Sequence, residues 1–407
     1  MRVKACRICK GKNLARFLDL GFHPPSDAFL RSERLFREEK KYPLDVFLCE
    51  DCGLVQLGYV VPPELMFNKE YVYVTSVSKT ADRHFEGYAE EVMSRFCKKG
   101  DFVVEIGSND GTLLKHFKSR GARVLGVDPS RAAMMAIKNS IETVNELFTE
   151  SRAREIVNSH GKAQAIVGAN VFAHINDLDD VLRGVGHLLK EGGVFVTEFP
   201  YLLHLVDSLE FDTIYHEHLS YFSLKPLAWL FKRFGMEIFD VTETPVHGGS
   251  VRLYVKRVGD KKLAGNLERL LEVEEKKKLY SLETYEKFAR DVEKFKEEFV
   301  SLLQDLKRKG ALIAGNGAPA KGNTLLNYCN IGPELIEFIA EINPLKHYTF
   351  TPGMHIPVLP LHSIQERPVD YMVIFPWNLK EDIMKQEHAF RDRGGKFIIP
   401  LPRPEIV

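Results

Sequence analysis

The sequence predicts an α/β protein with a small cysteine-rich module at its N-terminus. Three observations lead to this fold class. Two Cys-x-x-Cys pairs lie within the first 52 residues, a strand–glycine loop–helix pattern occupies residues 101–117, and a second such pattern begins at residue 311. Strands that alternate with helices in this way form parallel sheets covered by helices. We therefore expect three units, at about residues 1–70, 71–258 and 259–407.

The composition narrows the class of protein. The chain has 407 residues, of which 44% are hydrophobic, and its formal net charge is zero. Such a length allows two or three domains, and a neutral balance argues against a nucleic-acid partner. The first residues do not resemble a signal peptide, and no apolar run is long enough to cross a bilayer. We expect a cytoplasmic protein without a membrane partner.

The paired cysteines are Cys6 with Cys9 and Cys49 with Cys52. Each pair can present two thiolates from one tight turn, and four thiolates form a closed tetrahedral zinc site with no position for water. A module of about 70 residues has a small core, so one structural zinc ion would stabilise it. The alternatives are a redox-active pair or two unrelated turns.

The next unit begins with the sequence "DFVVEIGSNDGTLLKHF". Its apolar run predicts a buried parallel strand, residues 107–111 predict a tight loop, and a helix is expected from Thr112. A further strand, "ARVLGVDPS", ends in Asp128. Strand, glycine loop, helix and strand with a terminal acid form the plan of a nucleoside-binding Rossmann half, in which the acid binds the ribose hydroxyls.

The glycine loop lacks the Gly-x-Gly-x-x-Gly spacing of dinucleotide sites, and an acid, Glu105, precedes it. A carboxylate there repels phosphate and suits a cation, such as the ammonium and sulfonium groups of S-adenosylmethionine. The loop "EIGSNDG" resembles the first motif of class I methyltransferases. The alternative is an ordinary α/β domain without a cofactor. The residues expected to bind the donor are Glu105, Gly107, Ser108, Asn109, Gly111, Asp128 and Asn170.

The remaining chain predicts the end of this domain and one more. Two β-rich runs, 237–242 and 250–256, predict an antiparallel hairpin that closes the sheet. Residues 261–309 are rich in Lys, Glu and Leu and predict a solvated helical connector. The loop at 315–322 contains Lys321 and either binds an anion, such as a substrate diphosphate, or is a plain turn. No Ser or Thr follows the lysine, so the loop is not a Walker A motif.

The stretch "IYHEHLSYFS" at residues 214–223 places two histidines and a glutamate in an apolar run. A zinc-protease motif would need His at position 220, where Ser220 stands. A buried, hydrogen-bonded histidine is the plain alternative. The stretch follows the fifth predicted strand and His174 follows the fourth, at the sheet edge where α/β proteins bind ligands. We therefore expect these side chains to meet beside the methyl donor.

The motifs "EIGSNDG", "NVFAHI", "IYHEHLSYFS", "HGGSVR" and "GNGAPAKGNTLLNY", in one order behind a four-cysteine module, resemble the nucleotide-sugar C-methyltransferases. An example is the family that methylates the third carbon of thymidine-diphosphate-linked 4-keto-deoxysugars. The resemblance implies a class I methyltransferase Rossmann-like domain with an N-terminal zinc module and a second, C-terminal Rossmann-like domain that binds substrate. Methylation of oxygen or nitrogen on a related molecule is the alternative.

The resemblance also implies roles for individual residues. His218 is the expected base that generates an enolate, with His216 as the alternative base. The expected catalytic set is His218, Glu217, Tyr215 and His174. The sugar nucleotide is expected between the methyltransferase and C-terminal domains. The residues expected to bind it are Tyr71, Tyr73, His247, Ser250, Asn316, Lys321 and Asn323.

Overall fold

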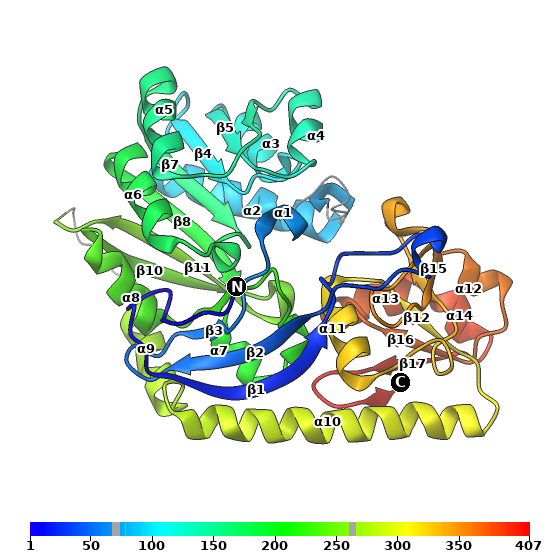
Figure 1. Cartoon of the computed structure of the whole chain (residues 1–407). Coiled ribbons are helices and arrows are strands. Elements are labelled where there is room, and N and C mark those ends of the chain that lie inside the picture. The colour runs from blue at the N-terminus through cyan, green and yellow to red at the C-terminus, as the bar shows by residue number, and fades with distance from the viewer. Residues whose placement is uncertain (67–73, 78, 260–265) are drawn as a thin grey trace.

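The computed structural model describes residues 1–66, 74–77, 79–259 and 266–407 (Figure 1). These residues form one four-stranded sheet and two seven-stranded sheets. The expected methyltransferase unit (residues 79–258) lies at the upper left of Figure 1, the cysteine module (residues 1–66) lies below it, and the C-terminal unit (residues 311–407) lies at the right. The expected α/β architecture is confirmed.

The sheet of the cysteine module has the strand order β1-β2-β3-β9, and its strand pairs are all antiparallel. Its strands are β1 (Leu14–His23), β2 (Tyr42–Cys49), β3 (Val55–Leu57) and β9 (Ser220–Tyr221). The fourth strand comes from a distant part of the chain, where Val55 pairs with Tyr221 and Gln56 with Ser220. The module in space therefore includes residues that directly follow the "YHEH" stretch. Two short elements follow β3, namely α1 (Pro63–Met66) and η2 (Thr75–Val77).

The central sheet has the order β10-β11-β8-β7-β4-β5-β6. Its strands are β4 (Phe102–Ile106), β5 (Arg123–Val127), β6 (Thr143–Val144), β7 (Ala163–Ala169), β8 (Leu189–Pro200), β10 (Met236–Thr244) and β11 (Ser250–Arg257). Strands β8, β7, β4, β5 and β6 run parallel, and the predicted hairpin is present as the antiparallel pair β10 and β11.

Helices cover both faces of this sheet, because both faces of β4 are apolar. Phe102, Val104 and Ile106 face one core, while Val103 faces the other core with Tyr88 of α2. The carboxyl ends of the parallel strands are left for the loops. The helices are α2 (Lys79–Phe96), α3 (Thr112–Ser119), α4 (Ala133–Lys138), α5 (Glu150–His160), α6 (Leu178–Leu188), α7 (Leu202–Asp207) and α8 (Leu224–Arg233).

The C-terminal sheet has the order β14-β15-β13-β12-β16-β17-β18, with five parallel strands from β15 to β17. Its strands are β12 (Ile313–Asn316), β13 (Ile339–Glu341), β14 (Thr349–Phe350), β15 (Pro357–Pro360), β16 (Tyr371–Ile374), β17 (Lys396–Ile399) and β18 (Glu405–Ile406). Its helices are α11 (Ala320–Cys329), α12 (Ser363–Glu366), α13 (Lys380–Gln386) and α14 (His388–Asp392).

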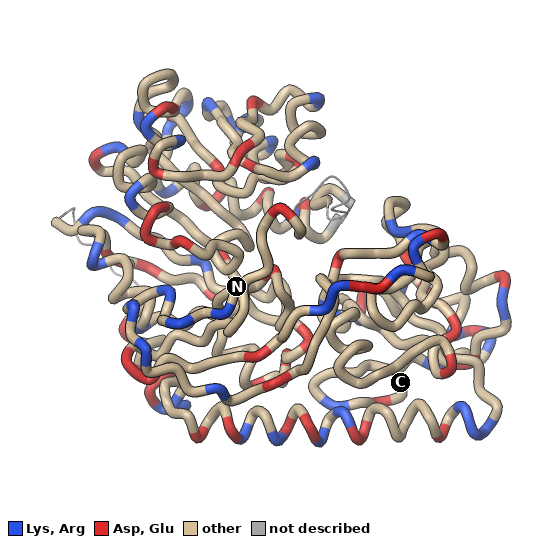
Figure 2. The backbone as a smooth tube through the Cα atoms, viewed as in Figure 1, with Lys and Arg blue, Asp and Glu red and all other residues tan. Residues whose placement is uncertain are grey.

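The predicted connector consists of α9 (Leu267–Lys276) and the 27-residue α10 (Leu282–Arg308). Buried residues recur along α10 at spacings of three or four, which makes one apolar stripe. They are Tyr285, Phe288, Val292, Phe295, Phe299, Leu303 and Leu306. The stripe packs against β1 and α11, so α10 runs beneath both the cysteine module and the C-terminal unit (Figure 1). Charges of both signs follow its length (Figure 2).

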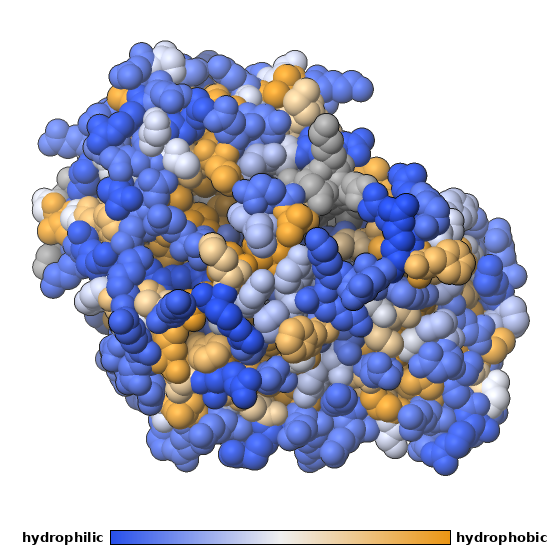
Figure 3. Space-filling model, viewed as in Figure 1, coloured by the Kyte–Doolittle hydropathy of each residue, from blue (hydrophilic) through white to orange (hydrophobic). Residues whose placement is uncertain are grey.

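The face of the molecule in Figure 3 is mostly hydrophilic, and hydrophobic residues gather in the middle of the view, where the upper unit meets the lower ones. Across the described ranges, every helix is too short or too polar to span a bilayer.

Candidate active site

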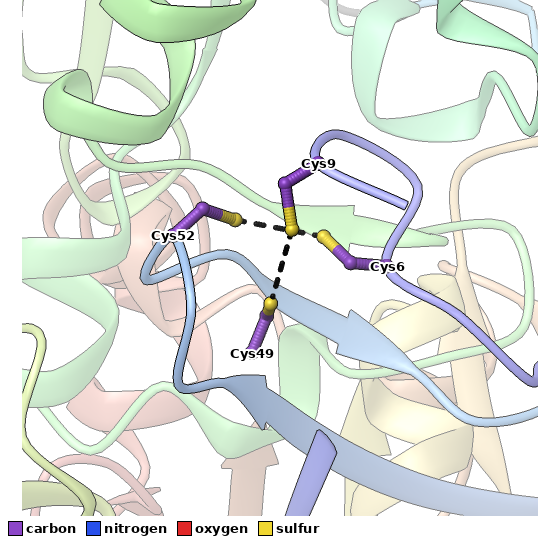
Figure 4. Close-up of side chains that lie close together, drawn as sticks. All are labelled: Cys6, Cys9, Cys49 and Cys52. Atoms are coloured by element: carbon purple, nitrogen blue, oxygen red, sulfur yellow. Dashed lines mark hydrogen bonds between the residues drawn. The ribbon is translucent and has the colours of Figure 1, made fainter. Parts of the chain in front are cut away.

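The four paired cysteines converge on one point at the edge of the module (Figure 4). Their Sγ atoms all lie within 4.8 Å of one another, and Cys6–Cys52 and Cys9–Cys49 are each 3.5 Å apart. A tetrahedron with Zn–S bonds of about 2.3 Å has sulfur–sulfur edges of about 3.8 Å. The four thiolates therefore fit zinc. They would fill its coordination and leave no open position for water or substrate, as in structural zinc sites.

The loop after β4 is built around glycine. Gly107 has a φ of 71°, and a Cβ there would come within 2.6 Å of Val171 Cγ2. Its N–H donates to the carbonyl of Val127, at 2.8 Å, which closes the loop against the end of β5. Gly111, with a φ of 79°, then precedes the first turn of α3. The predicted strand, loop and helix are confirmed at these positions.

Asp128 lies at the end of β5 and is fixed by this loop. Its Oδ2 accepts from the backbone N–H of Asn109 at 2.9 Å, and its Oδ1 accepts from the N–H and hydroxyl of Ser130. The side-chain oxygen of Asn109 accepts from the N–H and hydroxyl of Thr75 at 3.1 and 3.2 Å. The segment before α2 therefore covers the loop.

Glu105 provides the observation that fits a cationic donor. It is 4% exposed, and its Oε2 has no hydrogen-bond partner among the described residues. Burial, together with the nearby Asp128 and Asp110, raises the pKa of this carboxyl well above its ordinary value. A ligand with an ammonium and a sulfonium group would offset the surplus of negative charge. Ser108 Oγ, 2.4 Å from where a Cβ on Gly126 would lie, also has no partner in the described chain.

His218 holds a defined neutral tautomer. Its Nδ1–H donates to the carbonyl of Thr213 at 2.8 Å, and its Nε2 accepts from the hydroxyl of Tyr215 at 2.9 Å; this tautomer follows from the hydrogen-bond partners. Burial, and then the neighbouring His174, lower the pKa of His218 well below its ordinary value. The rings of His218 and His174 have centroids 5.1 Å apart, so the two predicted histidines meet. Burial lowers the pKa of His174 to about 4.

The two neighbours of His218 in the motif face different surroundings. Glu217 is 3% exposed, its Oε2 has no partner in the described chain, and burial, with Asp27, raises its pKa to about 8. It is therefore a protonated carboxyl that can donate a hydrogen bond at neutral pH. His216 is fully buried against the cysteine module, where its Nε2–H donates to the carbonyl of Tyr42 at 3.3 Å.

Two of the expected substrate residues, His247 and Lys321, lie in different units of the fold. His247, with a φ of 56°, accepts at Nε2 from the amide of Asn170, at 3.2 Å. Lys321 Nζ donates to Asn378 Oδ1 at 2.5 Å and lies 3.9 Å from the centroid of the Trp377 ring. These side chains come from the methyltransferase and C-terminal units respectively.

The remaining expected side chains bind protein atoms. The hydroxyl of Ser250 donates to the Val246 carbonyl at 3.0 Å, Asn316 Nδ2 lies 3.5 Å from Met372 Sδ, and Asn323 Nδ2 donates to the Ser26 carbonyl at 2.6 Å. Tyr71 and Tyr73 lie outside the described residues.

Sequence reasoning missed a buried ion-pair cluster at the end of β8. Glu198 is fully buried and accepts from Arg252 at 3.0 and 2.8 Å and from Nε2 of His84 at 2.5 Å. The guanidinium of Arg252 also lies 3.8 Å from the centroid of the Tyr88 ring. The signal that could have revealed it is Arg252, a charged residue within the apolar run of β11, since a buried charge requires a partner.

A second missed group lies beside Lys321. Asp212 is fully buried in η4 (Phe211–Thr213), and its Oδ2 accepts from Trp377 Nε1 at 2.7 Å. Burial raises the pKa of Asp212 to about 6 and that of Glu210 to about 8. One oxygen of each carboxyl has no partner among the described residues. The hydrogen bond from Trp377 to Asp212 thus joins the C-terminal unit to the methyltransferase unit, and the charge of Lys321 lies close enough to act on both acids.

Comparison with known proteins gives three family matches along the chain. A zinc binding domain matches residues 6–67, a methyltransferase domain matches 81–241, and a C-methyltransferase C-terminal domain matches 245–402. The C-methyltransferase NovU of Streptomyces niveus is 34% identical over 408 aligned residues, which cover 100% of this chain and 97% of the relative.

Two further similarities are partial. A ubiquinone biosynthesis O-methyltransferase of Rhodopseudomonas palustris (strain BisB18) is 27% identical over 30% of this chain and 46% of its own length. A solved SAM-dependent methyltransferase of Anabaena variabilis ATCC 29413 is 16% identical, covering 45% of this chain and 87% of that chain, with a TM-score of 0.36.

Each part of the fold thus has a matched counterpart, in the same order as the units described above. The methyl donor is S-adenosylmethionine, and the cysteine module binds a structural zinc ion. The similarity to one C-methyltransferase extends over the entire chain, including both the zinc module and the C-terminal unit. The chain therefore belongs to the C-methyltransferase family.

Proposed function

We propose that the protein methylates the carbon next to the ketone of a nucleotide-diphosphate-linked 4-keto-deoxysugar, through an enolate. We also propose that this step belongs to deoxysugar biosynthesis in the cytoplasm, as the resemblance of its motifs implies. The observation that carries the proposal is the tautomer of His218, whose Nε2 lone pair faces the hydroxyl of Tyr215 beside the ring of His174. A carbon acid needs such a base, because its proton must leave before the carbon attacks.

In the proposed mechanism His218 removes the proton from the substrate carbon. The Nδ1–H bond to Thr213 leaves the lone pair of the imidazole on Nε2. The substrate hydrogen replaces the Tyr215 hydroxyl as the partner of Nε2, and the C–H electron pair moves toward the ketone oxygen. The freed hydroxyl of Tyr215 turns to donate to that oxygen. Bound S-adenosylmethionine supplies an electrophilic methyl group on a sulfonium.

Glu217 and His174 support the developing negative charge in this proposal. A glutamate with a pKa of about 8 is protonated at neutral pH and can donate to an enolate oxygen, as an ionised carboxylate cannot. Burial keeps both His174 and His218 neutral before the reaction, so the proton meets no fixed imidazolium charge beside the base. The carbon would then accept the methyl group of bound S-adenosylmethionine, which would be released as S-adenosylhomocysteine, and His218 keeps the proton until product release.

The nucleotide diphosphate is assigned to the interface between the methyltransferase and C-terminal units. Lys321 extends from the start of α11 toward Trp377 and lies near two buried acids, Asp212 and Glu210. Burial lowers the pKa of Lys321 to about 8, so its ammonium remains largely charged at neutral pH. The N–H groups of Gly317 and Ala318 in this loop donate to Ala340 and Glu341, so the support for a diphosphate comes from the charged ammonium in the first turn of α11.

The test is exchange of the substrate's α-hydrogen in deuterium oxide with no methyl donor present. Enolate formation predicts deuterium at that carbon in a time-dependent reaction that requires His218. Methyl transfer without any exchange would favour an oxygen or nitrogen acceptor. The position of the transferred methyl group, read from the carbon NMR spectrum of the product, distinguishes these acceptors directly.

A further inference from the structure

Arg7 stands between two zinc ligands and reaches out of the zinc module. It lies in the turn from Cys6 to Cys9, and it is 5% exposed. Its Nη1 donates to two backbone carbonyls, those of Leu57 at 3.1 Å and Leu219 at 2.9 Å. Its Nε donates to Asn176 Oδ1 at 3.2 Å. One side chain therefore contacts β3 and two separate loops of the methyltransferase unit.

These two loops carry the histidines of the candidate site. Leu219 directly follows His218, and Asn176 lies two residues after His174. The loops are also bound to each other, because the N–H of Leu219 donates to the carbonyl of Ala173 at 2.8 Å. A shift of either loop would thus change the distance between the two imidazoles.

The zinc-binding turn also fixes the backbone of Arg7. The backbone N–H of Arg7 donates to Gln56 Oε1 at 2.9 Å, and Cys6 and Cys9 bind the metal on either side. A guanidinium is planar and presents its donors in a fixed fork, so it transmits the position of its backbone to several acceptors at once. A lysine at this place has one ammonium on a flexible stem and cannot keep three acceptors in register.

We infer that Arg7 is a positioning residue that sets the imidazoles of His174 and His218 from the zinc turn. Metal binding orders the turn, the turn orders the guanidinium, and the guanidinium holds the two loops. This inference rests on the proposed function only in that these histidines act in catalysis. The side-chain hydrogen bonds of Arg7 go to Leu57, Leu219 and Asn176, so it acts on the histidines through Leu219 and Asn176. The zinc module thereby contributes to the geometry of the active site as well as to folding.

The experiment compares Arg7→Met, which keeps the length of the side chain and removes its donors, with Arg233→Met. Arg233 is a matched control: its Nη1 donates to the Ile8 carbonyl in the same zinc turn, at 2.8 Å, but its other hydrogen bonds go to Asp179 and its guanidinium lies over the rings of Trp229 and Phe234. Both variants are prepared as the full zinc-loaded chain. The measurements are zinc content, melting temperature, donor affinity, steady-state kinetics and the nitrogen NMR signals of histidine side chains.

Arg7→Met is expected to keep one zinc ion and its donor affinity while kcat falls by about 10²-fold, the loss typical of a reacting group displaced by about 1 Å. The nitrogen signals of His174 and His218 should move or broaden, whereas Arg233→Met leaves them and kcat unchanged. Arg7→Lys should restore part of kcat. Wild-type signals and kcat in a zinc-loaded Arg7→Met protein would overturn the inference, as would equal effects of Arg233→Met.

Asn176→Ala provides a second route if Arg7→Met does not fold. Asn176 is exposed, and its replacement removes one of the three groups that accept hydrogen bonds from the Arg7 side chain. Its expected effect is a shift of the His174 signal with normal zinc content, and an unchanged signal would count against the inference. The NMR result does not depend on which residue is the base. If His218→Asn remained fully active, the proposed mechanism would fail while the positioning role was still decided by the signals.

Discussion

The hydroxyl of Tyr215 donates to Nε2 of His218 over 2.9 Å, and the centroids of the two rings are 4.1 Å apart. The opposite nitrogen of the imidazole donates to a backbone carbonyl. The base proposed here is therefore oriented by a peptide group, and its lone pair is paired with a phenol. A substrate must displace that phenol, which makes the tyrosine available to the ketone oxygen at the moment the proton leaves.

We expect His218→Asn to lower single-turnover methylation by about 10²–10⁴-fold, because asparagine fills the site but accepts no proton at neutral pH. Donor affinity should barely change. His216→Asn is the matched control, since His216 faces Tyr42 of the zinc module. Rapid-quench experiments give the single-turnover methylation rate of both variants, and α-hydrogen exchange is measured on both as well. Loss of exchange in His216→Asn with its retention in His218→Asn would show that the base is His216.

Asp128→Ala is expected to weaken S-adenosylmethionine binding by about 1.5–3 kcal/mol, the cost of losing hydrogen bonds to a charged acceptor. Its carboxylate also binds the N–H of Asn109, so the loop loses support at the same time. Ser130→Ala removes only one donor to this carboxylate and should have a smaller effect. Calorimetric titration gives both affinities. A dissociation constant unchanged by Asp128→Ala would exclude this acid from donor binding.

Removal of a zinc ligand should lower the stability of the fold more than the rate of the methyl transfer. Cys49→Ala leaves three thiolates, and the free energy of metal binding is part of the free energy of folding in such modules. We expect lower zinc content and a lower melting temperature. Cys329→Ala is the control, because Cys329 is buried but lies outside the cluster. Substoichiometric zinc combined with a normal melting temperature would contradict a structural role for the metal.

Acid should destabilise the fold through buried histidines. Burial lowers the pKa of His23 and of His216 from 6.5 to about 4. A lowered pKa means that the stabilisation is complete above pH 6.5 and is lost as the pH falls toward 4, by about 3 kcal/mol for each group. Glutamine does not titrate, so His216→Gln does not lose this stabilisation. The difference in the free energy of unfolding between the wild type and His216→Gln should therefore shrink as the pH falls from 6.5 toward 4. Urea titrations at several pH values measure it, and a constant difference would refute the assignment.

Lys321→Met should raise KM for the sugar nucleotide by about tenfold or more, because a charged hydrogen bond to phosphate contributes about 1.5–3 kcal/mol. Donor affinity should stay the same. Lys225→Met is a suitable control, since Lys225 also packs on an aromatic ring, with Nζ 4.3 Å from the Tyr280 centroid, but near α9. Initial rates at varied substrate decide the matter. Equal KM values in the wild type and Lys321→Met would remove the lysine from the site.

Local patterns in the sequence predicted much of the fold. The two cysteine pairs, the strand and loop around Gly107, and the hairpin of β10 and β11 each depend on residues close together in the chain. Short spacings of this kind reflect turn geometry and alternation of strand residues, and a single sequence displays both. The meeting of His174 and His218 followed from the rule that loops after parallel strands share one edge.

Contacts across the chain were not predictable in this way. Arg7 and Leu219 are 212 positions apart, and Arg252 and Glu198 are 54 apart. No periodicity connects such residues, because their proximity depends on how whole units pack. The same limit applies to side-chain direction. The family resemblance pointed to Ser250, Asn316 and Asn323, which lie in β11, β12 and α11, but it did not predict that their polar atoms bind protein groups.

The two-residue strand β9 has a consequence for the order of events during synthesis. Strand β3 ends at residue 57 and pairs with β2 on one side, but β9, its partner on the other side, is made 163 or more residues later. At about 5–20 residues per second, a nascent chain waits about 8–30 s before that edge can be paired. Until then β3 exposes an open strand edge, which is prone to pairing with other chains. The first module to leave the ribosome is therefore among the last to be completed.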